Sequence, residues 1–290
     1  MLPKTPFLAA MNFTSSVEVE TLIEIALRED MPQGDITSES IIPASAVSRA
    51  VFLAKESGRL AGLDIARRVF EKIDSAVMFE KKVEDGADFK KGDILAVIRG
   101  NSVALLKGER TALNFLQRLS GIATNTRKFV RAVRGTKTKV LDTRKTTPGL
   151  RTLEKYAVRM GGGQNHRLNL SEMVLIKDNH LRLAGSISQA VRTARAKVPP
   201  GIKIEVEVTD LKGAKEALAA GADMIMLDNM TLAAMKQIVR FLAGRVPVEA
   251  SGGVTLKRAA RIAALGVDTI SVGGLTHSYN SLDISLEFQE

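Results

Sequence analysis

The chain has 290 residues, of which 45% are hydrophobic, and its apolar runs are all far shorter than the roughly 18 residues of a membrane-spanning helix. Cysteine is absent, which excludes disulfides, a thiol nucleophile and cysteine-bound zinc and favours a cytoplasmic location. The formal net charge of +10 predicts anionic partners, whereas an aromatic content of 4% without tryptophan argues against nucleic-acid binding by base stacking.

The first third of the chain reads as helices with an antiparallel sheet. Residues 1–20 lack the charged-then-apolar pattern of a signal peptide. Apolar residues at helical spacing predict a helix over 16–30, with Ser16 as its N-cap. Short alternating runs punctuated by Gly58 and by Asp85-Gly86 then predict strands, and a helix is expected over about 103–119. We therefore expect an N-terminal α+β domain over residues 1–117.

From Lys137 onward the pattern changes to strands that alternate with helices. The strand-like runs are TKVLDTRK, MVLIKDNH, IKIEVEVTD, DMIMLDNM, VPVEASGG and DTISVGG. Helical segments at 186–197, 211–220, 231–242 and 255–265 separate the later runs, as in a parallel βα repeat. With one more strand expected near 155–170, the repeat suits an α/β barrel over 118–276. A doubly wound nucleotide-binding sheet is disfavoured because neither G-x-G-x-x-G nor a Walker loop is present.

Polar residues at the ends of these strands indicate a site, because active sites of α/β barrels lie at the carboxyl ends of their strands. The first ends supply cations, and the stretch DTRKTTPGLR brings Arg144, Lys145 and Arg151 close together. Cations repel one another, so their crowding at a strand tip predicts a bound anion. The middle ends supply carboxylates and the last two supply glycine pairs.

The glycine pairs predict a phosphate site. Ser251-Gly252-Gly253 and Gly273-Gly274 lack bulky side chains, so their backbone N–H groups can approach a phosphate closely. A helix beginning after Thr255 would add the positive end of its dipole. Phosphate sites after the last two strands recur in barrel enzymes.

The carboxylates allow several interpretations. Glu207 and Asp228 could hold Mg²⁺ through water, bind sugar hydroxyls, stabilise a developing sugar cation, or form a glycoside-hydrolase pair. The cations nearby favour a phosphorylated or carboxylated substrate over a neutral glycan. Alternation in IEVEV turns Glu205 and Glu207 to the same side of the strand, so spacing alone does not choose between them.

The stretch GGGQNHRLNLSEMVLIKDNH contains two of the three histidines of the chain. His166 precedes Arg167 after three glycines, which indicates part of an anion site. A histidine metal site is disfavoured because no H-x-x-x-H pair and no cysteine accompany them, and His180 is interpreted as structural.

Taken in order, ERTALNFLQRLSGIAT, DTRKTTPGLRTLEKYAVRMGGGQNHR, LIKDNH, VEVT, MLDNM, EASGG and VGGLTHS resemble the quinolinate phosphoribosyltransferase family, as does LREDMPQGDITSE near the N-terminus. The resemblance implies an N-terminal open-faced α/β sandwich and an incomplete TIM-like α/β barrel, with residues 277–290 returning to the first domain. It implies transfer of phosphoribose from phosphoribosyl pyrophosphate to quinolinate with decarboxylation. It also implies a homodimer, or a higher homo-oligomer, with shared active sites.

The same resemblance assigns roles to particular residues. Quinolinate would be bound by Arg144, His166, Arg167 and Lys177 of one chain and by Arg110 of the partner. Phosphoribosyl pyrophosphate would be bound by Lys145, Glu207, Asp228, Ser251, Gly252, Gly253, Gly273, Gly274 and His277. The catalytic residues would be Lys145, Lys177, Glu207 and Asp228, with Mg²⁺ held through water by the two carboxylates.

Two alternatives remain at this point. A related family associated with molybdenum transport shares the TRK and HR motifs, but ERTALN and LIKDNH fit the quinolinate family better. A basic RNA-binding protein would explain the net charge. It would not need paired carboxylates and glycine pairs at successive strand ends, and no zinc-finger or helix-turn-helix spacing is present.

Overall fold

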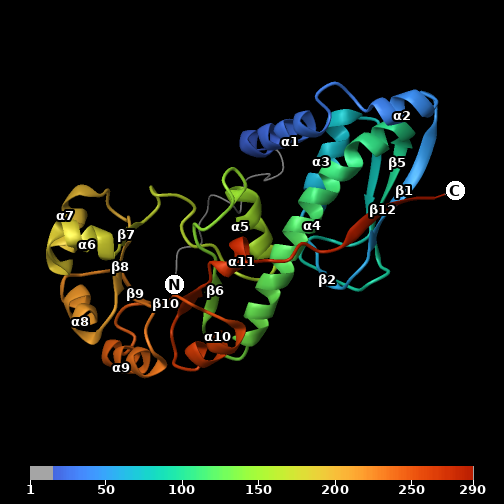
Figure 1. Ribbon diagram of the computed structural model, residues 1–290. Coiled ribbons are helices and arrows are strands. Elements are labelled where there is room, and N and C mark those ends of the chain that lie inside the picture. Colours follow the sequence, from blue (N-terminus) through green and yellow to red (C-terminus); the bar gives the residue numbers. More distant parts are fainter. Residues whose placement is uncertain (1–15, 290) are drawn as a thin grey trace. The chain divides into compact units, whose positions relative to one another are not determined.

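The computed structural model describes residues 16–289 and divides into two compact units (Figure 1). The first unit contains the described residues up to Thr124, together with 148–161 and the chain from Tyr279 onward; the second contains 125–147 and 162–278. The predicted boundary at 117/118 falls within one long helix. Most of the stretch considered for a signal peptide, and the last residue of the predicted C-terminal segment, lie outside the described residues.

The first unit combines helices with an antiparallel sheet, as predicted. Its helices are α1 (Val17–Asp30), α2 (Ile36–Ile41), α3 (Leu63–Ile73), α5 (Arg151–Met160) and the first part of α4 (Ser102–Ala132). Its strands are β1 (Val47–Ala54), β2 (Gly58–Arg59), β3 (Met78–Lys81), β4 (Asp88–Phe89), β5 (Ile94–Asn101) and β12 (Ile284–Gln289). The main sheet has the order β12-β1-β5-β3, and β2 pairs with β4 in a separate ribbon.

The core of this unit lies between the sheet and its helices. Phe52 of β1 and Phe70 of α3 pack edge to face, with ring centroids 6.2 Å apart. Gly108 lets α4 pack closely on α3, because a Cβ there would lie 2.6 Å from the Phe70 ring. Near the C-terminus, β12 pairs antiparallel with β1, with Leu286 opposite Phe52.

The prediction of a strand near residues 155–170 is wrong. This stretch contains most of α5 and a loop, in which Gln164 makes only an isolated bridge to Leu141. Helix α5 is amphipathic and packs within the first unit, where the Tyr156 hydroxyl donates to Asp85 at 2.6 Å. Its apolar residues therefore serve a helix face and not a barrel strand.

The second unit is a parallel α/β structure. Its strands are β6 (Lys139–Leu141), β7 (Val174–Ile176), β8 (Ile204–Val208), β9 (Met224–Asp228), β10 (Val248–Ser251) and β11 (Thr269–Ser271). Its helices are the remainder of α4, α6 (Asp178–Ala184), α7 (Ile187–Lys197), α8 (Leu211–Ala219), α9 (Leu232–Leu242), α10 (Leu256–Ala263) and α11 (Gly274–His277). The sheet order is β6-β11-β10-β9-β8-β7.

This sheet is an incomplete barrel, because β6 and β7 form its two edges and are not paired with each other. Every strand pair in it is parallel. Side-chain caps start several helices where the sequence has an oxygen-bearing residue: Asp210 accepts from Gly213, Thr231 from Ala234 and Thr255 from Arg258. Because all six strands run parallel, they end at the same rim of the sheet, and their terminal side chains lie close together there.

Candidate active site at the strand ends of the barrel

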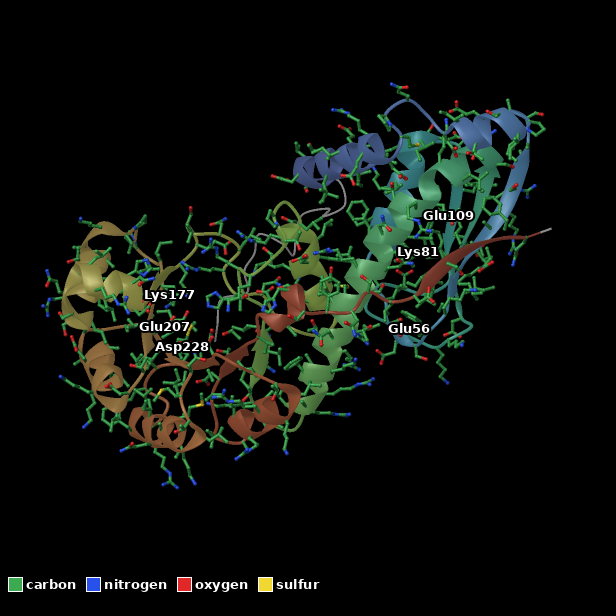
Figure 2. The ribbon with its side chains drawn as sticks, viewed as in Figure 1. Glu56, Lys81, Glu109, Lys177, Glu207 and Asp228 are labelled. Atoms are coloured by element: carbon green, nitrogen blue, oxygen red, sulfur yellow. The ribbon has the colours of Figure 1, made fainter. Side chains whose placement is uncertain are left out.

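A cavity of about 870 Å³ lies at the carboxyl ends of the strands of the second unit. We call it the strand-end cavity. Of the residues predicted from the sequence, it is lined by Arg144, Lys145, His166, Arg167, Lys177, Glu207, Asp228, Ser251, Gly252, Gly253, Gly273, Gly274 and His277. Lys177 directly follows β7, and Glu207 and Asp228 belong to β8 and β9; the three side chains lie in the same part of the unit in Figure 2.

Two arginines give one part of the cavity its positive charge. The Nε of Arg144 is buried and has no hydrogen-bond partner within the described residues. Burial and the neighbouring Arg144 both lower the pKa of the Arg167 guanidinium, although Glu205 opposes this shift. An orphaned buried donor and two cations close together are costly unless an anion joins them. The arrangement suits a ligand with carboxylate or phosphate oxygens.

Lys145 also lines the cavity, and two hydrogen bonds hold its backbone. Its N–H donates to the Thr143 hydroxyl at 3.0 Å, and its carbonyl accepts from the Thr276 hydroxyl at 2.8 Å. A Cβ on Gly273 would lie 3.0 Å from the Lys145 side chain and 3.1 Å from the His277 ring. Glycine at position 273 therefore lets the Lys145 side chain and the His277 ring pack against the backbone of this loop.

The sequence did not decide whether Glu205 or Glu207 belongs to the site, and their positions in the structure differ. Glu207 is half-buried and lines the strand-end cavity, whereas Glu205 is completely buried beneath it. Burial raises the pKa of Glu207, the Asp228 carboxylate raises it further, and Lys177, whose Nζ is 3.5 Å from the Glu207 carboxylate, lowers it. Glu207 and Asp228 thus repel each other. A hydrated Mg²⁺ ion would relieve this repulsion, because carboxylate oxygens are the ligands that Mg²⁺ prefers.

The glycines after β10 adopt conformations that favour glycine. Gly252 has φ = 90° and Gly253 has φ = 56°, both in the left-handed region. A Cβ on Gly252 would lie only 2.2 Å from the Asn229 side-chain oxygen. Asn229 itself has φ = 51°, lines the cavity, and donates a hydrogen bond to Asp228. It was absent from the predicted site. Its position directly after Asp228 was a usable signal, because Asn tolerates left-handed backbone better than most residues.

A buried acidic cluster lies at the base of the cavity. Glu205 on β8 and Glu249 on β10 are both completely buried. Burial raises the pKa of Glu205 to about 7. Burial, followed by repulsion from Glu205, raises the pKa of Glu249 to about 8. Glu205 was the alternative to Glu207 in the sequence, and Glu249 was not assigned to the site, although strand alternation in VPVEASGG already turns Glu249 to the same side as Ser251.

Arg110 belongs to the first unit. It is exposed on α4, and its side chain has no hydrogen bond or ion pair in the described part of the chain. Its assignment to the active site of a partner chain stays a prediction.

The fold and the cavity together define a class: a barrel protein whose strand ends line a cavity suited to anions, with paired carboxylates and two glycine loops. Two sequence models match the chain, those of the N-terminal domain of quinolinate phosphoribosyl transferase over residues 35–120 and of its C-terminal domain over 122–287. The chain belongs to the quinolinate phosphoribosyltransferase family.

Similar proteins cover almost the whole chain. The nicotinate-nucleotide pyrophosphorylase (carboxylating) of Mycobacterium leprae is 44% identical over 271 residues, covering 91% of this chain and 95% of its own. The mitochondrial quinolinate phosphoribosyltransferase (decarboxylating) 2 of Nicotiana glauca is 38% identical over 289 residues, covering 93% and 82%. The crystal structure of NadC from Streptococcus pyogenes has a TM-score of 0.91 at 44% identity, covering 94% and 98%.

None of the helices in the described part of the chain has both the length and the apolar character needed to cross a membrane.

Proposed function

We propose that this protein transfers the phosphoribosyl group of phosphoribosyl pyrophosphate to quinolinate with decarboxylation. The products are nicotinate mononucleotide, pyrophosphate and CO₂, and the enzyme is a pentosyltransferase of NAD biosynthesis. The observation that carries the proposal is the composition of the strand-end cavity. Two arginines, one with an orphaned buried donor, share it with Glu207, Asp228 and two glycine loops.

Quinolinate is a pyridine with two adjacent carboxylates, and the cationic part of the cavity suits it. Arg144 and Arg167 would each pair with a carboxylate, because a guanidinium fork matches the two oxygens of a carboxylate. Lys177 and His166 line the same cavity and would complete this subsite. The unpartnered Nε of Arg144 would then gain an acceptor.

Phosphoribosyl pyrophosphate would occupy the remainder of the cavity. Its 5′-phosphate would be bound by backbone N–H groups of Ser251 to Gly253 and of Gly273-Gly274, with His277 close by. Lys145 would face the pyrophosphate. Mg²⁺, held through water by Glu207 and Asp228, would offset the charge of the pyrophosphate.

The chemistry follows from these placements. The pyridine nitrogen already has a lone pair, so its attack on the anomeric carbon needs no general base. As pyrophosphate leaves, the ribose becomes positively charged, and Glu207 and Asp228 would stabilise that charge. The new positive charge on the ring nitrogen then stabilises the electron pair left at C2 when CO₂ departs. Glycosyl transfer therefore precedes decarboxylation, and C2 finally takes up a proton.

We also propose a homodimer, or a higher homo-oligomer, in which Arg110 completes the quinolinate subsite of the partner chain. The support is the exposure of Arg110, which forms no ion pair in its own chain within the described residues. A cytoplasmic location is proposed from the absence of cysteine alone.

Mass spectrometry of the reaction products tests the function directly. The purified protein is incubated with quinolinate, phosphoribosyl pyrophosphate and Mg²⁺, and we expect nicotinate mononucleotide. Nicotinate replaces quinolinate in a matched reaction. We expect it to react at least about 10³-fold less efficiently, because it would leave a cationic subsite unpaired. Comparable use of nicotinate would contradict the assignment of the arginine pair, and no nucleotide product from either acid would contradict the function.

A further inference from the structure

His166 lies above two buried glutamates that no step of the proposed reaction uses. Its Nε2 is 3.2 Å from the Glu205 carboxylate and 3.7 Å from that of Glu249. The glutamates come from β8 and β10, the strands on either side of β9. Both are completely buried, and each has one carboxylate oxygen without a hydrogen-bond partner in the described residues. Two such groups are expensive to bury, so they need a structural or functional reason.

The other ring nitrogen of His166 is also engaged. The backbone N–H of Arg167 donates to His166 Nδ1 at 2.8 Å. A ring nitrogen that accepts an N–H does not carry its own proton, so the proton of the neutral ring is on Nε2 and points at the glutamates. The imidazole therefore bridges the backbone of Arg167 and the carboxylates beneath it. In this tautomer neither ring nitrogen is free to accept a hydrogen bond from a ligand.

The same tautomer argues against a metal at this cluster. Ligand atoms of His166, Glu205 and Glu249 lie within 4.8 Å of one another, which is close enough for a shared cation. A metal at Nε2 would require the proton to move to Nδ1. Nδ1 already faces the N–H donor of Arg167, so the two hydrogens would collide.

The backbone on the N-terminal side of His166 is anchored as well. Its N–H donates to Asp142 Oδ1 at 2.9 Å, and the Asn165 side chain donates to Asp142 Oδ2 at 2.5 Å. Beyond His166, the Arg167 guanidinium donates to the Met173 carbonyl at 2.8 Å. The orientation of Arg167 thus depends on a chain of contacts that starts at the two glutamates.

We propose that Glu205 and Glu249 are positioning residues for the dicarboxylate subsite: they hold the His166 ring, and the ring holds Arg167. This inference rests on the proposed function, in which Arg167 pairs with quinolinate. Recognition of two adjacent carboxylates by guanidinium forks depends on angle as well as charge. We call the contacts from Glu205 and Glu249 through His166 to Arg167 the tether. Loss of the tether therefore affects quinolinate binding more than phosphoribosyl pyrophosphate binding.

Steady-state kinetics of four variants test the proposal. Glu205→Ala is expected to raise KM for quinolinate by about tenfold, the effect of losing the hydrogen bond to His166 Nε2. Glu249→Ala removes a carboxylate that lies 3.7 Å from Nε2 and should raise this KM by a smaller factor. KM for phosphoribosyl pyrophosphate should change by no more than about twofold. Glu205→Gln and Glu249→Gln keep an acceptor oxygen and should restore the quinolinate KM to within about threefold of the parent enzyme.

Val206→Ala is the matched control. Val206 is buried on the opposite face of β8, so its truncation costs stability without touching the tether. We expect its quinolinate KM to stay unchanged. Unchanged quinolinate KM in both glutamate-to-alanine variants would overturn the proposal, and so would an equal rise in the Val206→Ala control.

A second measurement does not depend on catalysis or on the alanine variants folding. Nitrogen-15 NMR of the imidazole rings distinguishes the two tautomers, and the chain has only three histidines to assign. Substitution of His180 and of His277 assigns their signals, which leaves His166. We expect a ring protonated at Nε2 and not at Nδ1. Protonation at Nδ1 would overturn this arrangement of the ring even if quinolinate is turned over. Absence of turnover with the expected tautomer would instead reject the proposed function.

Discussion

The side-chain amide of Asn229 donates a hydrogen bond of 2.7 Å to the carboxylate of Asp228, the preceding residue. Asn229 reaches this position from left-handed backbone at φ = 51°. Its backbone N–H donates to the Ser251 carbonyl at 3.1 Å, which joins the ends of β9 and β10. The strained residue thus orients a carboxylate that faces the strand-end cavity.

Replacing Asn229 by glycine should lower kcat without changing the fold. Glycine accepts the left-handed backbone but cannot hold Asp228, and a hydrogen bond to a charged group at this exposed position is worth about tenfold in rate. Steady-state kinetics measure the change. Ala243→Gly is the control, because Ala243 also has positive φ (45°) but ends α9. A normal kcat in Asn229→Gly would show that Asp228 needs no such support.

Asp228→Asn should lower turnover by about 10²–10³ while quinolinate affinity is kept, because the lost charge acts on the developing sugar cation. Calorimetry with quinolinate and single-turnover kinetics separate the two quantities. Asp223→Asn at the opposite end of β9 is the matched control. Asp223 accepts the Ile204 N–H and pairs with Arg195, so its substitution affects stability only. Loss of quinolinate binding with normal saturated turnover would contradict the role of Asp228.

Arg110→Ala and Arg144→Ala should each be nearly inactive, and mixing them should restore activity. If each site combines Arg110 of one chain with Arg144 of the other, a mixed dimer has one doubly defective site and one intact site. Equal random mixing should therefore return about a quarter of the parent activity. Co-expression with two different tags isolates the mixed dimer, which should have about half of the parent activity because one of its two sites is intact. An inactive mixed dimer would mean that Arg110 serves its own chain or that the chains assemble differently.

The buried Glu249 should make the protein less stable as pH rises. Its pKa is raised from 4.5 to about 8, because burial and the facing Glu205 disfavour its charge, with only partial relief from His166 and Thr269. The folded state therefore keeps a proton that the unfolded chain releases above its lower pKa. This group's stabilisation is complete below the unfolded pKa and is lost as pH rises toward about 8.

Urea unfolding at about pH 5, 6.5 and 8 measures this effect, which is at most about 1.4 kcal/mol per pH unit for one proton. The glutamine in Glu249→Gln cannot ionise. The free energy of unfolding of this variant should therefore fall less than that of the parent as pH rises. Glu287→Gln is the control, because the Glu287 carboxylate is exposed, pairs with Lys55 and has a lowered pKa. Parallel stability curves for Glu249→Gln and the parent would contradict a raised pKa at Glu249.

Local patterns predicted much of the fold and the composition of the site. Apolar runs that stop at polar residues located the parallel strands. Periodicity alone failed over 155–170, where apolar residues belong to α5 and a loop. Short apolar stretches satisfy a helix face and a strand equally well, and only the partner that buries them decides.

The sequence by itself determined which residue types stand at the strand ends, because side-chain alternation and glycine conformations are local properties of the chain. It could not decide between Glu205 and Glu207, which share one side of β8. The tertiary structure decided this, since packing places Glu207 in the cavity and buries Glu205 beneath it. Depth in a barrel depends on what the neighbouring strands and loops place above each residue. For Glu205 that neighbour is His166, which is 39 positions away in the chain.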